Sequence, residues 1–202
     1  MSAGIEGRPG GRPVEYPGEH PAEEIAVEAR KSSSRLRTFI EVVAIVVAAF
    51  VIALLVQAFI VKPFTIHQVS MRPTLEEGDR ILLNRLAYRF GEPAVGDIVV
   101  FDSPINAEED LVKRIVGVSG DRISVSDGDL YVNGVAQSET YLLERDFEGE
   151  MREVVVPAGE VFVMGDNRNN SGDSRQFGPI STDSIIGSAF CVYWPIGHWR
   201  GL

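Results

Sequence analysis

The sequence predicts a mainly β domain, coiled into a barrel or sandwich, behind one N-terminal transmembrane helix. Two observations lead to this prediction. One long apolar stretch lies near the N-terminus, and short alternating or β-branched runs follow it, separated by turn residues. The 202 residues are enough for one domain with a core plus appendages.

Residues 1–37 form the first predicted segment, a disordered cytoplasmic tail. The segment is rich in Gly, Pro, Glu and Arg, and it has no apolar periodicity. Such a composition does not bury enough apolar surface to offset the entropy lost on ordering.

Residues 38–62 are the predicted transmembrane signal anchor. From Phe39 to Val61, only Glu41 and Gln57 interrupt the apolar sequence. As a helix this stretch is roughly 34 Å long, enough to span a bilayer core. A buried core helix is the alternative, but core helices are seldom apolar on all faces. No small-x-small cleavage site follows, so we expect the anchor to remain uncleaved.

Charge next to the anchor predicts its orientation. Arg30, Lys31, Arg35 and Arg37 precede it, whereas Lys62 alone follows it closely. Basic residues concentrate on the cytoplasmic side of a membrane helix. We therefore expect a single-pass protein with a cytoplasmic N-terminus and an extracytoplasmic domain over residues 63–202.

The extracytoplasmic part carries the strand signals. Predicted strands lie at 97–101, 122–125, 130–132, 154–156 and 161–163, with turn signals at 126–129, 133–134 and 157–159. The stretch Arg80–Arg89 fits a strand or a helix, and the pattern leaves both open. The single cysteine, Cys191, allows no intramolecular disulfide, and its apolar neighbours predict a buried strand position.

Composition and missing motifs exclude several classes of function. A net charge of −10 argues against nucleic acid as a partner. The sequence has no HExxH or CxxC metal motif, no GxxxxGK[ST] loop and no GxGxxG loop. We therefore expect no metal and no cofactor.

Three segments are candidates for carrying chemistry: Ser70–Leu75, then Lys113–Gly117 after a strand, and the polar loop Gly165–Arg175. Each alone is weak evidence, because most loop serines are solvated and most lysines are surface charges. The third segment is a long polar loop between apolar strands, and such loops often carry function.

A serine activated by a neutral lysine fits these segments. His67 is three residues from Ser70 and would have to fold back sharply to reach it, so a Ser-His-Asp triad is the less natural arrangement, although the spacing leaves it open. Lys113 lies between apolar pairs at 111–112 and 115–116. Burial there would lower its pKa far enough for it to act as a base.

Four ordered motifs resemble the type I signal peptidases in their bacterial form. They are Ser-Met-x-Pro-Thr-Leu at 70–75, Gly-Asp-Ile-Val-Val-Phe at 96–101, Lys-Arg-x-x-Gly-x-x-Gly-Asp at 113–121 and Gly-Asp-Asn-Arg-x-x-Ser-x-Asp-Ser-Arg at 165–175. The resemblance covers nearly everything from the anchor to Trp199. It implies a signal-peptidase-like catalytic domain with a small β subdomain at about residues 126–157.

The resemblance also implies catalytic roles. Ser70 would be the nucleophile and Lys113 the general base. Ser171 would hydrogen-bond the lysine amine and orient it. Asp173 and Arg175 would form an ion pair that braces the site.

Two further roles concern the substrate. The backbone N–H of Ser70 would form part of the oxyanion hole, and Met71 would line the pocket for a small substrate side chain. Gln68 stands where many family members have Ser or Gly. Its amide could supply a second oxyanion donor, or it could point away.

The implied function is that of a membrane-bound serine endopeptidase, signal peptidase I, in the bacterial plasma membrane. Its partners would be precursor proteins bearing signal peptides, together with membrane lipids. Five apolar or aromatic residues are candidates to contact lipid headgroups: Phe59, Ile60, Phe64, Trp194 and Trp199. For the two tryptophans, core packing is an equal alternative.

Two other classes of protein are alternatives to this function. A self-cleaving repressor also uses a Ser/Lys pair on a related fold, but it needs a DNA-binding helix-turn-helix in place of the apolar anchor. A catalytically inactive, membrane-tethered β-domain that binds exported chains is the second alternative. Loss of Ser70 or Lys113 would indicate it, and both residues are present.

Overall fold

The computed structural model describes residue 10 and residues 21–106, 108–144 and 149–202. For residues 21–36 and 57–59 it describes the backbone alone. The chain divides into two compact units, Met1–Val51 and Ile52–Leu202. The β-strands all belong to the second unit, together with the end of the first helix.

Helix α1 covers Pro21–Phe59. The sequence predicts a disordered tail over residues 1–37, but residues 21–37 belong to this helix. Residues 1–9 and 11–20 of the predicted tail lie outside the described residues. Good helix formers such as Ala, Glu and Arg fill residues 22–30, and proline is favoured in a first helical turn. At the other end the helix stops before residue 62, because Pro63 has no N–H to continue it.

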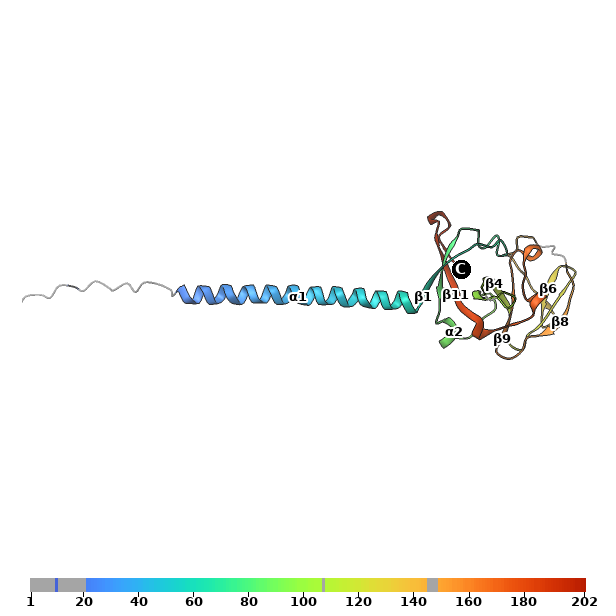
Figure 1. The fold of residues 1–202 in the computed structure, drawn as a ribbon, viewed down its shortest axis with the longest axis horizontal. Coiled ribbons are helices and arrows are strands. Elements are labelled where there is room, and N and C mark those ends of the chain that lie inside the picture. The colour runs from blue at the N-terminus through green and yellow to red at the C-terminus, as the bar shows by residue number, and fades with distance from the viewer. Residues whose placement is uncertain (1–9, 11–20, 107, 145–148) are drawn as a thin grey trace, which may run out of the picture. The chain divides into compact units, whose positions relative to one another are not determined.

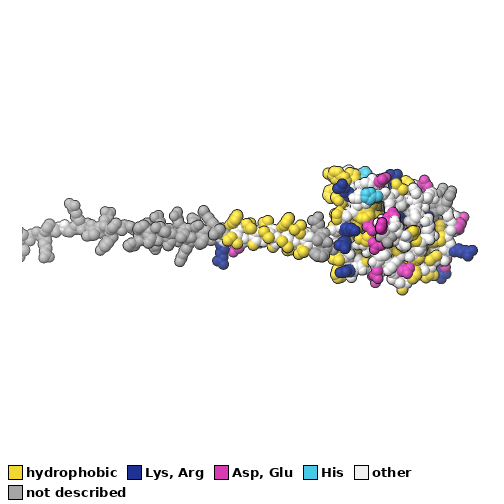
Figure 2. Space-filling model, in the orientation of Figure 1, with side chains coloured by type: hydrophobic (Ala, Val, Ile, Leu, Met, Phe, Trp, Pro, Cys, Tyr) yellow, Lys and Arg dark blue, Asp and Glu magenta, His cyan; other side chains and the backbone are white. Residues whose placement is uncertain are grey.

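The apolar part of α1 has the properties expected of a membrane span. Within the described residues, the helix from Arg37 to Val56, 20 residues, is long and apolar enough to cross a membrane, and none of this stretch is buried inside the protein. Figure 2 shows hydrophobic side chains along the visible side of this stretch.

The second unit is built on two antiparallel sheets. Its strands are β1 (Val61–Thr65), β2 (Arg80–Asn84), β3 (Ile98–Asp102), β4 (Asp110–Gly117), β5 (Arg122–Ser126), β6 (Asp129–Val132), β7 (Val135–Ala136), β8 (Met151–Val155), β9 (Glu160–Met164), β10 (Ile180–Ser181), β11 (Ile185–Trp194) and β12 (Arg200–Gly201). The larger sheet has the order β1-β2-β11-β3-β4-β9-β10, with β12 on β11, and the smaller has the order β7-β6-β5-β8. Figure 1 shows β6 and β8 on the opposite side of this unit from β1 and β11.

Short helical segments fill the connections: α2 (Ala87–Phe90), η1 (Arg168–Asn170), α3 (Ser174–Phe177), η2 (Thr182–Ser184) and η3 (Ile196–His198). The predicted strands at 97–101, 122–125, 130–132, 154–156 and 161–163 correspond to β3, β5, β6, β8 and β9, which confirms the mainly β class. The ambiguous stretch at 80–89 is a strand first, β2, and then the short helix α2.

Strand β3 forms the centre of the core. Its residues 98–101 are all buried, as expected for a central strand covered on both faces. Three buried apolar clusters pack on the sheets, and β3 contributes Ile98 and Val100 to one of them and Val99 and Phe101 to another.

The two tryptophans near the C-terminus are not packed in the core. Trp194 and Trp199 are 48% and 74% exposed, so neither is an ordinary core residue. Cys191 lies in β11, as predicted, but is only partly buried rather than fully buried.

Candidate active site

The segment that carries Ser70 leaves β1 and folds into tight turns. The N–H of Arg72 donates to the carbonyl of Val69 at 3.2 Å, and that of Leu75 donates to Met71 at 2.8 Å. Ser70 lines a cavity and is only 6% exposed.

Lys113 meets this serine from the middle of β4. Its Nζ donates a hydrogen bond to Ser70 Oγ at 2.7 Å, across 43 residues of sequence. The lysine lies within β4, not after a strand as the sequence suggested, and it is paired in register with Val99 of β3. A lysine that is 1% exposed in the middle of a central strand is rare without a role in chemistry.

Burial dominates the titration of Lys113. It lowers the pKa of the amine from 10.5 to about 8, because the charged form loses its hydration. Nearby Asp173, Glu109 and Asp166 raise the pKa, and Arg175 lowers it. The net result is an amine that is neutral in a sizeable fraction of molecules near physiological pH.

The loop 165–170 fixes the backbone next to Ser70. The N–H of Asn167 donates to the carbonyl of Ser70 at 2.9 Å, and its side-chain amide donates to Val69 at 3.2 Å. Gly165 lies so close to this segment that a Cβ there would come within 2.5 Å of the Ser70 carbonyl. Any larger residue at 165 would therefore push the loop away from Ser70.

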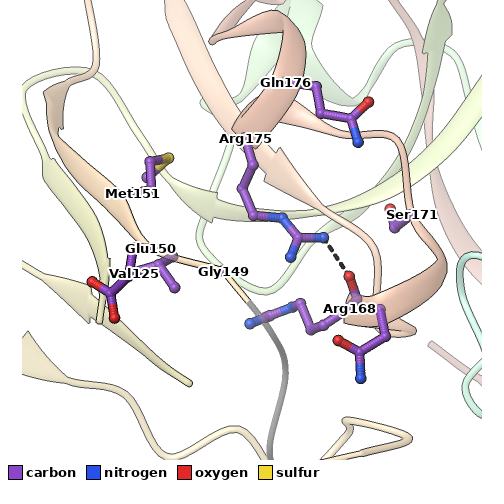
Figure 3. Close-up of a pocket in the computed structure, with 9 residues that line it drawn as sticks. Val125, Gly149, Glu150, Met151, Arg168, Ser171, Arg175 and Gln176 are labelled. Atoms are coloured by element: carbon purple, nitrogen blue, oxygen red, sulfur yellow. Dashed lines mark hydrogen bonds between the residues drawn. The ribbon is translucent and has the colours of Figure 1, made fainter. Parts of the chain in front are cut away.

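The predicted ion pair between Asp173 and Arg175 is present. Two guanidinium nitrogens of Arg175 each lie 2.8 Å from a carboxylate oxygen of Asp173, which is fully buried. Asp173 also accepts from the N–H of Gly165 at 3.1 Å, and Arg175 donates to the carbonyl of Arg168 at 2.7 Å (Figure 3). The pair thus ties both ends of the loop together.

A second pair of ionic contacts was not anticipated from the sequence. Arg114 holds the buried carboxylate of Asp166 through bonds of 2.9 and 2.8 Å, and its guanidinium lies 4.1 Å from the centroid of the Tyr141 ring. Arg168 holds Glu139 in the same two-pronged manner, with both side chains nearly inaccessible. Arg114 and Asp166 stand inside the recognised motifs, next to Lys113 and Gly165, whereas nothing in the sequence around Glu139 signals its partner.

Ser171 differs from its predicted role. Its Oγ is buried and, among the residues that the structure describes, has no hydrogen-bond partner, so the predicted bond to the Lys113 amine is not formed. The hydroxyl is packed against Gly165 instead: a Cβ built at 165 would lie 2.3 Å from it. The position of the Ser171 side chain is therefore set by its close packing against Gly165.

Gln68 also differs from the predicted oxyanion donor. Its Nε2 donates to Glu109 Oε1 at 3.0 Å and, more weakly, to the carbonyl of Asp110 at 3.4 Å. Both N–H groups are therefore engaged away from an oxyanion. The backbone N–H of Ser70 has no acceptor within the described part of the chain, so it is available as an oxyanion donor.

Met71 does not line the cavity beside Ser70. It is 1% exposed and packs in a core cluster with Ile66 and Leu75. The tight turn after Ser70 directs the next side chain inward, which sequence position alone did not reveal. The cavity, about 440 Å³, is lined instead by apolar and polar groups from four segments: His67, Gln68, Val69, Ser70, Ser103, Ile105, Asn106, Glu109, Leu111, Lys113, Asn170, Gly172 and Phe177.

A separate cavity of about 560 Å³ does not include the Ser70–Lys113 pair. It lies between the small sheet and the loop 165–178, with Val125, Gly149, Glu150 and Met151 on one side and Arg168, Ser171, Arg175 and Gln176 on the other (Figure 3).

The histidines do not form a triad with Ser70. His67 is exposed and lines the cavity, but its ring has no hydrogen bond to Ser70. His198 pairs with Asp79 at 2.8 Å, and neither of these residues lines the cavity. Across the described residues, no group of three or more His, Cys, Asp or Glu is placed to hold a metal ion.

Comparison with known proteins gives consistent matches. Residues 39–194 match the family described as "Signal peptidase, peptidase S26". Thylakoidal processing peptidase 1 of Arabidopsis thaliana is 40% identical over 66% of this chain, which corresponds to 42% of that protein's own length. Probable signal peptidase I-1 of Synechocystis is 38% identical over 71% of this chain and 76% of its own length.

One solved structure, a signal peptidase I from Enterococcus faecalis, is 34% identical and matches 48% of this chain and 96% of its own, with a TM-score of 0.44.

The buried amine predicts a stability effect. A pKa lowered from 10.5 to about 8 on folding corresponds to about 3 kcal/mol of destabilisation at pH values where the amine is protonated in both the folded and the unfolded protein. Lys113→Met should therefore raise the melting temperature in detergent by about 5–10 °C at pH 7, because an apolar side chain of similar volume has no such cost. The gain should be largest below pH 8 and shrink as the pH approaches 10.5. The partly exposed Lys62→Met is the control. An unchanged or lower melting temperature for Lys113→Met contradicts the burial cost.

Proposed function

Because the chain belongs to the S26 family of signal peptidases, we propose that it is a membrane-anchored serine endopeptidase that removes signal peptides from exported precursor proteins. The observation that carries the proposal is the 2.7 Å hydrogen bond between the buried Lys113 amine and Ser70 Oγ. An amine with a lowered pKa beside a hydroxyl that lines a cavity supports a Ser/Lys dyad.

In the first step, Ser70 Oγ attacks the scissile carbonyl carbon while neutral Lys113 accepts the hydroxyl proton. The tetrahedral intermediate then collapses: the C–N bond breaks, and Lys113 donates the proton to the leaving amine. An ester between Ser70 and the signal-peptide carboxyl carbon remains.

Water completes the cycle. Lys113, neutral again after the first step, accepts a proton from water as the water oxygen attacks the ester. The C–O bond to Ser70 breaks, and the proton returns to Ser70 Oγ. The serine and the neutral lysine are regenerated together, so no other base is needed.

Charge that develops on the carbonyl oxygen requires a hydrogen-bond donor. The free backbone N–H of Ser70 supports this role, and Gln68 does not in its present contacts. Asn167 holds the peptide unit that carries this N–H, because its side-chain amide donates to the carbonyl of Val69 in the same unit. A donor fixed in advance in this way costs no reorganisation during reaction.

We infer that the apolar helix anchors the enzyme in a membrane, with bacterial plasma membrane as the proposed location. Strand β1 begins at Val61, soon after α1 ends at Phe59. The chain from Val61 to Ser70 can extend about 30 Å at most, so the nucleophile stays near the membrane surface. The exposed Trp194 and Trp199 are suited to contact lipid headgroups there.

An inactive domain that only binds exported chains is the less favoured function. Such a protein has no need for a lysine that lowers the stability of the fold, and both Ser70 and Lys113 are present and hydrogen-bonded. The self-cleaving repressor is also disfavoured, because the family match includes the apolar helix from residue 39.

The dyad is tested by mutation. Ser70→Ala and Lys113→Met should each abolish cleavage of a precursor with an Ala-x-Ala site, measured by sequencing the new N-terminus. Because the two residues act as one unit, the double variant should lose about as much activity as either single variant. Additive losses, or normal cleavage by either single variant, would refute the assignment.

Cleavage should also depend on pH through Lys113. The neutral amine is the active form, and its pKa is lowered to about 8 by burial. In the free enzyme kcat/KM should therefore rise about tenfold per pH unit below pH 8 and level off above it. A profile that continues to rise toward pH 10.5 shows that the lysine is not desolvated during catalysis.

The orientation of the anchor can be measured separately. Basic residues before the apolar helix predict a cytoplasmic N-terminus. A protease added outside intact spheroplasts should digest the domain after Lys62 and spare an epitope fused to residue 1. Protection of the domain, with loss of the epitope, would reverse the proposed topology.

A further inference from the structure

Glu109 lies on the wall of the catalytic cavity, and none of the motifs assigns it a role. Its carboxylate accepts the 3.0 Å hydrogen bond from Gln68, which stands two residues before the nucleophile. The bond joins the β3–β4 connection to the segment that carries Ser70, across 41 residues of sequence.

The position of Glu109 is set by the backbone. The N–H of Ser103 donates to the carbonyl of Glu109 at 2.9 Å, and the N–H of Glu109 donates to Asn106 at 3.0 Å. These bonds close the hairpin just before β4 begins at Asp110. The backbone of Glu109 is thus fixed beside the cavity, and its side chain remains exposed to solvent.

Glu109 lies where two cavities meet. The first, about 440 Å³, contains Ser70 and Lys113. The second, about 400 Å³, runs between residues 64–68 and residues 108–112. His67, Gln68 and Glu109 line both, so an extended peptide that fills both cavities passes over the Gln68–Glu109 bridge.

The surroundings leave this point negatively charged. Glu108 and Asp110 are the sequence neighbours of Glu109 and line the second cavity with it. The Nζ of Lys62 lies 4.0 Å from a carboxylate oxygen of Asp110, so it partly neutralises the charge of Asp110 and not that of Glu109. Facing Glu109 are neutral Gln68 and the titratable His67, and the buried Lys113 is near enough to respond to its charge.

Resting on the proposed function, we propose that Glu109 is a specificity-determining residue that selects precursors by the charge of a side chain near the scissile bond. Lysine or arginine at that substrate position is favoured, and aspartate or glutamate is disfavoured. A cationic side chain replaces the neutral amide of Gln68, or joins it, at the carboxylate, whereas an anionic one is repelled.

The expected size of the charge preference follows from the solvent exposure of the Glu109 side chain. Exposed ion pairs contribute little individually, but a Lys-to-Glu exchange in the substrate changes attraction into repulsion. We expect a preference of about three- to tenfold in kcat/KM for Lys over Glu at low salt. The preference should weaken as salt rises, because solvent-exposed charges are screened.

The test uses the full-length enzyme in detergent and a set of precursors. Each precursor keeps its Ala-x-Ala site and carries Lys, Gln or Glu either between the two alanines or at one of the three positions after the scissile bond. The wild-type enzyme should prefer Lys over Gln over Glu at one or more positions. Glu109→Gln keeps an acceptor for Gln68 and should lower that ratio toward one, and Glu109→Lys should reverse it.

A second measurement separates charge from structure. Glu109 raises the pKa of Lys113, so Glu109→Gln should move the acid limb of the pH profile to lower pH. Glu77→Gln removes an exposed carboxylate outside both cavities and should change neither the Lys/Glu ratio nor the pH profile.

The outcomes distinguish this inference from the proposed function. If the wild-type enzyme cleaves none of the precursors, the proposed function fails. If it cleaves them all without regard to charge, or if Glu109→Gln keeps the wild-type Lys/Glu ratio, Glu109 is not the determinant and the inference is overturned. Misfolding of Glu109→Lys leaves the Glu109→Gln comparison decisive.

Discussion

The hydrogen bond between Lys113 and Ser70 is the constraint on which the rest of the catalytic unit depends. A lysine amine in the middle of a buried strand opposes folding, because its charged form loses hydration. The same loss of hydration makes the amine a usable base. The core around β3 and β4 must therefore be stable enough to tolerate a residue that a purely structural protein would replace with an apolar one.

The charges around Lys113 have to be balanced for this to work. Asp173 and Asp166 raise the pKa of the amine, but burial lowers it by more. Each carboxylate is held by an arginine, Asp173 by Arg175 and Asp166 by Arg114. The paired carboxylates act as structural anchors, and burial remains the largest influence on the pKa of the amine.

These ion pairs also explain how a long polar loop can be rigid. The loop 165–175 is tied to itself through Asp173 and to the Ser70 segment through Asn167. Arg168 connects it to Glu139, in the connection between β7 and β8. Because the two ion pairs, Asp173–Arg175 and Arg168–Glu139, are largely buried, breaking either one leaves an unpaired charge, which resists movement of the loop.

The sequence by itself determined the apolar helix, the five predicted strands and the residues Ser70, Lys113, Asp173 and Arg175. Apolar runs, period-two alternation and ordered motifs are local signals, so they can be read along the chain. The bounds of α1 were less well determined, because helix propensity extends it to Pro21 without any apolar face.

The tertiary structure alone decided the contacts between distant segments. It placed Lys113 Nζ 2.7 Å from Ser70 Oγ, a distance that the motifs do not give. It turned Gln68 toward Glu109 and buried Met71 in the core, because the register of β4 and the turn after Ser70 set which way those side chains point. It also left Ser171 without the predicted lysine contact. Side-chain direction at a turn depends on packing partners 40 or more residues away, and no local pattern encodes that.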